Sequence, residues 1–139
     1  MEKGRDYIGV GVGAIVVDRG RVLLLKRRKE PEFGCWGIQG GAVEFGESIE
    51  DAVKREVKEE LSVEVELVAL LGVTDHILPH AGVHWVSPVF LAKSASDTPK
   101  HAERDKHSEL LWFGLDDLPD DVTLTTRRAV ELLASRGAG

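Results

Sequence analysis

Apolar residues alternate with small ones in the first patterned stretch of the chain. Between residues 7 and 17 every second position is apolar, and three of the intervening positions are glycine. This period of two is typical of a strand with one bare face. Glycines along one face indicate that something packs closely there, and a helix fits this interpretation better than a bound base or ribose. The apolar face comprises Ile8, Val10, Val12, Ala14 and Val16, and the bare face Gly9, Gly11 and Gly13.

Further apolar runs predict the remaining strands and two helices. The strands fall at residues 22–25, 36–39, 63–73, 83–93 and 110–113, with turns and polar loops between them. One helix begins at about Ser48, and a last helix begins at Thr125 or Thr126 and continues to about residue 135. The polar stretch 94–108 predicts a loop long enough to fold over a site.

The helix near Ser48 carries acids where apolar residues are expected. Ser48 is a good N-cap, and Asp51 follows three residues later to complete the cap. At about 100 degrees per residue, Glu60 lies inside the apolar stripe, and Glu56 and Glu59 border it. Three carboxylates therefore share one side of the helix next to its buried face. The apolar stripe consists of Ile49, Val53, Val57 and Leu61.

Crowded, partly buried carboxylates take up protons or bind cations, because like charges repel and buried acids are rarely unpaired. A hard divalent ion with oxygen ligands, Mg²⁺ or Mn²⁺, meets this need. The alternative is a solvated acidic face neutralised by Lys54, Arg55 and Lys58. The position of Glu60 within the apolar stripe favours the metal site.

The segment before this helix has the residues of a ligand-binding loop. Gly40 and Gly41 let a ligand approach the main chain, and Gly46 frees the turn before the helix. Glu47 precedes Arg55 by eight residues, so an ion pair between them can tie the loop to the helix.

Residues 41 to 63 resemble the Nudix box of the Nudix hydrolases. Gly41 is followed after five residues by Glu47, and after seven more by the run Arg55-Glu56-Val57-Lys58-Glu59-Glu60 and then Leu61-Ser62-Val63. Two positions depart from the pattern. Ser62 replaces the usual Gly at the helix exit, which costs about 1 kcal/mol if the residue is left-handed. Gln39 replaces a frequent Pro.

The resemblance implies an α/β fold in which a mixed β-sheet is sandwiched between helices, as one domain over residues 1–139. It also implies an enzyme that hydrolyses the pyrophosphate bond of a nucleoside diphosphate derivative with Mg²⁺ or Mn²⁺. A non-catalytic module that senses nucleotides is an alternative from a different class, although such modules usually lose acids of the box. An isomerase on this scaffold needs a suitably placed Cys, which Cys35 does not match.

The same resemblance assigns roles to individual residues. Glu56, Glu59 and Glu60 are the implied metal ligands, a carbonyl of Gly40 or Gly41 is a further ligand, and the catalytic base among the acids stays open. Relatives often add an acid shortly before a Trp on a later strand, which makes Glu109 the candidate and Glu103 the reserve. The catalytic set is Glu47, Arg55, Glu56 and Glu59.

Substrate contacts are predicted mainly outside the box. Arg27 either reaches a substrate phosphate or caps a solvated strand end, and Phe33 can stack on a base. Gly40 lets the substrate approach the main chain. The glycines of residues 9–13 and the phrase at residues 44–47 are similar to the branch that cleaves nucleoside triphosphates to monophosphate and pyrophosphate. ADP-ribose or a dinucleotide is the second candidate.

Charge and composition exclude several other classes. A net charge of -6 and an acidic isoelectric point disfavour stable binding to nucleic acids or anionic membranes. With no apolar leader and no long apolar run, the chain is expected to be a cytoplasmic protein. A homodimer stays open.

The cysteine and histidines give no metal signature. Cys35 is the only cysteine, which excludes an intrachain disulfide and a cysteine-rich zinc site. His76, His80 and His84 fit no standard zinc spacing and are expected at the surface or at the edge of a substrate site.

Overall fold

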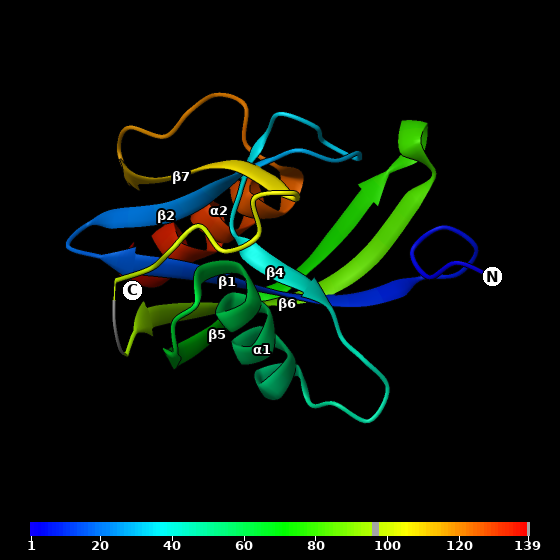
Figure 1. Ribbon diagram of the computed structural model, residues 1–139, viewed down its shortest axis with the longest axis horizontal. Helices are drawn as coiled ribbons and strands as arrows, with labels where there is room; N and C mark the ends of the chain where they lie inside the picture. Colours follow the sequence, from blue (N-terminus) through cyan, green and yellow to red (C-terminus); the bar gives the residue numbers. More distant parts are fainter. Residues whose placement is uncertain (96–97, 139) are drawn as a thin grey trace.

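The computed structural model describes residues 1–95 and 98–138 of the chain. Its elements are seven strands of one sheet, two α-helices and one short 3₁₀ helix (Figure 1). The strands are β1 (Gly9–Asp18), β2 (Arg21–Arg27), β3 (Trp36–Gly37), β4 (Gln39–Ala42), β5 (Val65–Leu78), β6 (Val83–Ser94) and β7 (His107–Gly114). The helices are α1 (Ile49–Leu61), η1 (Pro79–Ala81) and α2 (Leu124–Ala138).

The sheet is mixed, and β1 is its centre. The strand order is β3-β2-β1-β6-β5, with β4 also paired to β1 and β7 to β2. β1 runs parallel to β6, and the other pairs are antiparallel. This arrangement places β4, with its two consecutive glycines, beside the middle of β1.

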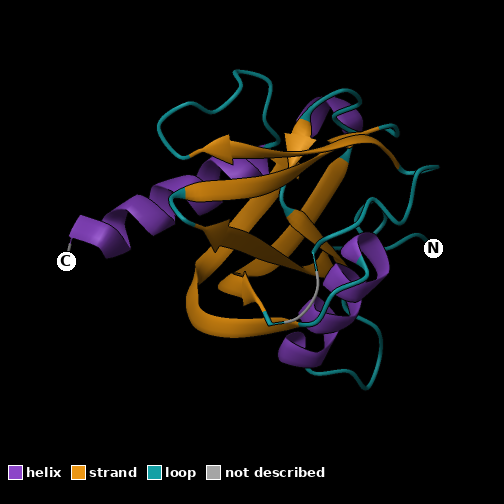
Figure 2. Ribbon diagram, turned by 60° about the vertical axis from the view of Figure 1, so that its left-hand side comes forward, coloured by secondary structure: helices purple, strands orange, loops and turns teal. Residues whose placement is uncertain are grey.

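The two α-helices cover opposite faces of the sheet, which confirms the predicted sandwich (Figure 2). On one face α1 buries Val53, Val57 and Leu61 against residues of β1 and β2. On the other, Ala129 of α2 packs with Ile15 in a second core. No helix within the described residues is both long enough and apolar enough to cross a membrane.

Side chains of β6 crowd Gly9 and Gly11, so the predicted helix over the glycines was wrong, while Gly11 and Gly13 line a cleft, which leaves the second interpretation of a bound base or ribose open. A Cβ atom on Gly9 would overlap the Trp85 ring, and one on Gly11 would lie 2.7 Å from Ser87 Oγ. Gly9 pairs with Trp85 in the parallel register of β1 and β6. The glycines therefore make room for large neighbours on β6, and the strand alternation alone does not reveal which neighbours these are.

The last helix begins earlier than the sequence predicts. Thr123 Oγ1 accepts a hydrogen bond of 3.2 Å from the backbone N–H of Thr126, so Thr123 acts as the cap. Thr126 is fully buried, and its hydroxyl accepts a hydrogen bond of 2.9 Å from the Ile38 N–H. Thr126 thus ties α2 to the segment between β3 and β4 and cannot serve as the exposed start of the helix.

Candidate active site

Helix α1 begins and ends as the sequence predicts. The Ser48 hydroxyl accepts a hydrogen bond of 3.1 Å from the Asp51 N–H. At the other end Ser62 adopts the left-handed conformation, with φ of 57°, and its N–H bonds to the Lys58 carbonyl. Ser62 therefore takes the conformation for which Gly is usual, and the helix keeps the phase that buries Glu60.

β4 passes so close to both β1 and α1 that a side chain on either of its glycines would overlap a neighbour. A Cβ atom on Gly40 would overlap the Val12 carbonyl, and one on Gly41 would overlap the Glu56 carboxylate. The Gly40 N–H donates a hydrogen bond of 2.9 Å to Glu60 Oε1. The main chain of the glycines and the acids of α1 thus form one surface.

Glu60 is a buried carboxylate, which excludes the alternative of a fully solvated acidic face. Its exposed fraction is 6%. Burial raises the pKa of Glu60 well above its ordinary value, the negative charges of Glu56 and Glu103 raise it further, and the Gly40 N–H opposes this change. Burial also raises the pKa of Glu56, against the opposing effect of Arg55. Glu59 is the most exposed of the three helix acids, with 45% of its side chain accessible.

Arg55 holds the loop and the acids of α1 together. Its Nε and Nη2 atoms donate to the two oxygens of Glu47 at 2.7 and 3.0 Å, and Nη2 also donates to the Ala42 carbonyl at 3.0 Å. Nη1 lies 2.9 Å from Glu56 Oε1 and 3.3 Å from Glu59 Oε1. The hydrogen bonds from Arg55 hold the pKa of Glu47 below its usual range. The four residues of the predicted catalytic set therefore lie together.

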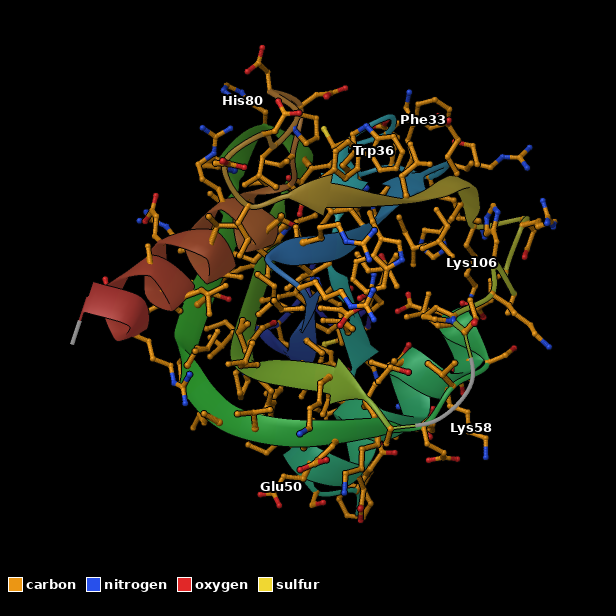
Figure 3. The ribbon with its side chains drawn as sticks, turned by 90° about the vertical axis from the view of Figure 1, so that its left-hand side faces the viewer. Phe33, Trp36, Glu50, Lys58, His80 and Lys106 are labelled. Atoms are coloured by element: carbon orange, nitrogen blue, oxygen red, sulfur yellow. The ribbon has the colours of Figure 1, made fainter. Side chains whose placement is uncertain are left out.

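The fourth acid of the cluster is Glu103, the reserve candidate. Ligand atoms of Glu60, Glu103 and His107 all lie within 4.8 Å of one another. His107 Nε2 lies 3.8 Å from Glu60 Oε2. Burial, and next the positive charge of Arg27, lowers the pKa of His107 to about 4, so its ring is neutral at pH 7. Lys106, labelled in Figure 3, lies with its Nζ atom 3.2 Å from Glu103 Oε2.

The structure does not bring Glu109 to this cluster. Glu109 faces Lys26 across β7 and β2, and the Lys26 Nζ to Glu109 Oε2 distance is 3.7 Å. The next residue, Leu110, packs against the core on the α1 side, so Glu109 points to the opposite side of the sheet. A register shift between Lys26 and Arg27 pairs Arg27 with His107 instead.

A cleft of about 310 Å³ continues from the acids along β4. Its lining includes Arg27 and Gly40, two of the predicted substrate contacts, together with Gly41, Glu60 and His107. Phe33 does not line it, and 63% of its surface is exposed. The predicted stacking of Phe33 on a base therefore has no support from this geometry. Figure 3 labels Phe33 and Trp36 close together beside β7.

A second polar group at the cleft was missed by sequence reasoning. His76 Nδ1 lies 2.9 Å from Thr125 Oγ1, and His76 Nε2 lies 3.4 Å from Glu32 Oε1. The other oxygen of Glu32 accepts a hydrogen bond of 2.8 Å from the Leu124 N–H at the start of α2. Burial lowers the pKa of His76. His76 lines the cleft, within the surface or substrate-edge positions expected for the histidines, whereas Glu32 gave no signal because it lies in an unpatterned loop.

Comparison with known proteins assigns the family. The NUDIX domain matches residues 8–133, so the chain belongs to the Nudix family. It is 35% identical to the ADP-ribose pyrophosphatase of Methanocaldococcus jannaschii, over 86% of this chain and 70% of that protein. It is 34% identical to the mouse 8-oxo-dGDP phosphatase NUDT18 over 82% of this chain, but spans only 33% of that protein's length.

A solved structure agrees with this assignment. The crystal structure of a MutT NUDIX hydrolase from Burkholderia pseudomallei matches with a TM-score of 0.89 and 48% identity, over 92% of this chain and 99% of that one. The predicted Nudix fold is confirmed, and so is the enzyme class, a Nudix pyrophosphohydrolase.

Substitution of Gly41 tests whether β4 positions Glu56. In Gly41→Ala the new methyl group overlaps the Glu56 carboxylate and displaces it, so we expect turnover to fall roughly 10- to 100-fold with the fold retained. Steady-state kinetics and circular dichroism measure the two effects. Gly40→Ala is the contrasting variant, because its methyl group meets the Val12 backbone and is expected to destabilise the fold. Full activity of Gly41→Ala would contradict the positioning role.

Proposed function

We propose that the chain catalyses the divalent-metal-dependent hydrolysis of a pyrophosphate bond in a nucleoside diphosphate derivative. A nucleoside triphosphate, cleaved to the monophosphate and pyrophosphate, is the first candidate substrate. The observation that carries the proposal is the buried Glu60, surrounded by Glu56, Glu103 and His107. A carboxylate with a raised pKa among other acids is costly to charge unless a cation accompanies it.

The donor set fits Mg²⁺ or Mn²⁺. Glu56, Glu59 and Glu60 supply carboxylate oxygens, Glu103 adds a fourth acid, and the main chain at Gly41 adds a carbonyl; Glu109 is not part of this set. A divalent ion held here would supply the positive charge that offsets the substrate phosphates and would promote ionisation of the attacking water. Among these acids, Glu56 and Glu59 share Arg55, which sets their positions.

Residues around the acids hold the other parts of the substrate. Arg27 lines the cleft and carries the positive charge that a phosphate requires. Its Nε atom donates to the Pro31 carbonyl at 2.9 Å, and its terminal nitrogens, which make no hydrogen bond within residues 1–95 and 98–138, are free to bind a phosphate. Gly40 lines the cleft, and its backbone N–H bonds Glu60, so the substrate would meet the main chain of β4 beside this acid. Glu47 acts through Arg55 and keeps the loop before α1 in place.

The volume of the cleft supports the binding of one nucleotide. Its volume of about 310 Å³ lies near the lower end of the range of roughly 300–1,000 Å³ for small-molecule sites. Glu60 of the acidic cluster lines it, and so does the group of Glu32, His76 and Thr125. In the proposed complex the nucleoside occupies the cleft and the polyphosphate reaches Glu60 and the acids beside it.

A screen of nucleotides with Mg²⁺ tests the proposal. The purified protein is incubated with the common nucleoside and deoxynucleoside triphosphates, oxidised guanine nucleotides and ADP-ribose, and the products are separated by anion-exchange chromatography. Monophosphate plus pyrophosphate from a triphosphate is the expected result, and addition of EDTA should abolish it. Absence of metal-dependent turnover on every compound would favour the alternative of a nucleotide-sensing module.

ADP-ribose is the second candidate. It is favoured by the relative from Methanocaldococcus jannaschii, which is named ADP-ribose pyrophosphatase and is 35% identical to this chain. Cleavage of ADP-ribose yields AMP and ribose phosphate instead of pyrophosphate. The same chromatographic screen therefore separates the two candidates by their second product.

A further inference from the structure

The side chain of His107 is the one feature of the acidic cluster that an all-oxygen metal site does not explain. Only 9% of this side chain is exposed. Its Nδ1 atom has no hydrogen-bond partner within residues 1–95 and 98–138. Its Nε2 atom faces Glu60 Oε2 at 3.8 Å, a distance too long for a hydrogen bond. Buried polar atoms usually have hydrogen-bond partners, so a buried imidazole with an unpaired nitrogen is expected to bind a ligand.

The surroundings of His107 fix where that group would lie. Ligand atoms of His107, Glu60 and Glu103 lie within 4.8 Å of one another. Donor atoms bound at about 2.1 Å to a common ion lie about 3.0–3.4 Å apart at octahedral or tetrahedral angles. Side-chain movements of about 1 Å would therefore close this group around one ion. The backbone on either side is held, because the His107 carbonyl accepts a hydrogen bond of 2.7 Å from His101 Nε2.

We propose that His107 supplies an imidazole nitrogen ligand to an ion shared with Glu60 and Glu103, and that this site selects Mn²⁺, Co²⁺ or Zn²⁺ over Mg²⁺. Imidazole suits these transition metals, whereas Mg²⁺ prefers oxygen ligands. Lys106 competes for the same place, since its Nζ atom lies 3.2 Å from Glu103 Oε2 and must move when the ion binds. The inference deepens the proposed function, because it rests on the acidic cluster being a metal site.

Pulsed electron paramagnetic resonance on Mn²⁺ tests the nitrogen ligand directly. The protein with one equivalent of Mn²⁺ is expected to show the nitrogen modulation of a bound imidazole, and His107→Gln is expected to lose it. His80→Gln is the matched control, because His80 is exposed and is labelled well away from Lys106 in Figure 3. His101→Gln, in which the glutamine amide can still donate to the His107 carbonyl, excludes the neighbouring imidazole as the source. Retention of the modulation in His107→Gln would overturn the proposal.

The metal preference is measured on the same samples. Mg²⁺ is titrated against bound Mn²⁺, and His107→Gln should lower the Mn²⁺ to Mg²⁺ affinity ratio about tenfold or more, because the nitrogen ligand is gone. An unchanged ratio would contradict the proposal. If His107→Gln does not fold, wild-type protein labelled at histidine with the heavier nitrogen isotope gives the answer, since a histidine ligand must change the modulation and an oxygen-only site cannot.

The outcome is independent of the hydrolase assignment. Nitrogen modulation without turnover of any nucleotide supports the His107 site and counts against the proposed reaction. Metal-dependent turnover with only oxygen ligands supports the reaction and overturns the His107 site.

Discussion

Replacement of Glu60 with glutamine is expected to lower turnover by roughly three orders of magnitude, equivalent to about 4 kcal/mol of barrier, while leaving the metal-free fold intact. Glutamine has nearly the shape of glutamate and keeps a side-chain oxygen that can accept a hydrogen bond from the Gly40 N–H. In the wild type this N–H donates to Glu60 Oε1 at 2.9 Å. It cannot supply the negative charge that holds a divalent ion. Steady-state kinetics with the best substrate of the nucleotide screen measures the loss.

The stability of the same variant should differ from that of the wild type in its dependence on pH and on added metal. Because burial raises the folded-state pKa of Glu60 above its ordinary value of 4.5, Glu60 favours folding below pH 4.5, and this stability is lost as pH rises through the folded-state pKa. In EDTA at pH 8, Glu60→Gln should therefore unfold at the same temperature as the wild type or higher. Added Mg²⁺ or Mn²⁺ should raise the melting temperature of the wild type only.

Glu50→Gln is the matched control for Glu60→Gln. Glu50 lies exposed in the first turn of the same helix, so its replacement removes one negative charge from α1 without touching the cluster. Figure 3 labels Glu50 at the end of the molecule opposite Phe33. Glu60→Gln with turnover within a few-fold of wild type, or with an unchanged metal-induced rise in melting temperature, would exclude Glu60 as a metal ligand.

The local parts of the site could be predicted from the sequence because they depend on one helix. Ser48 caps α1, and a period of 3.6 residues then places Glu60 among the buried residues with no further information. The contact between Glu47 and Arg55 could be predicted from their spacing, because both residues belong to α1 or to the loop directly before it. The fold was predictable for a similar reason, since the pattern of residues 41 to 63 is specific to one family.

The parts that depend on strand register could not be predicted. His107, and not Glu109, reaches the cleft because the register of β2 and β7 shifts between Lys26 and Arg27. A one-residue shift exchanges the two faces of a strand, and no residue in the polar loop before β7 signals it. The packing of the Trp85 ring on Gly9 could not be predicted for the same reason, because it depends on the parallel pairing of β1 with β6.

Arg55→Lys is expected to reduce turnover roughly 10- to 100-fold and the free energy of unfolding by about 1–3 kcal/mol. Arginine presents a planar fork of donors, and here the fork binds both oxygens of Glu47, the Ala42 carbonyl, and one oxygen each of Glu56 and Glu59. Lysine keeps the charge but cannot make these contacts together. Kinetics and urea unfolding in EDTA measure the two effects separately.

The contacts of Arg55 also predict how its variants combine. Glu47→Gln removes the charge of the acid that binds the fork through both oxygens, so the double variant Arg55→Lys with Glu47→Gln should lose less stability than the sum of the two single losses. Arg128→Lys is the control, since Arg128 lies exposed on α2 and pairs with the exposed Glu131 at 3.3 Å, so its replacement should change neither measurement. Additive losses would show that Arg55 and Glu47 act independently. In that case the loop before α1 is held by other contacts, and the positions of Glu56 and Glu59 do not depend on Glu47.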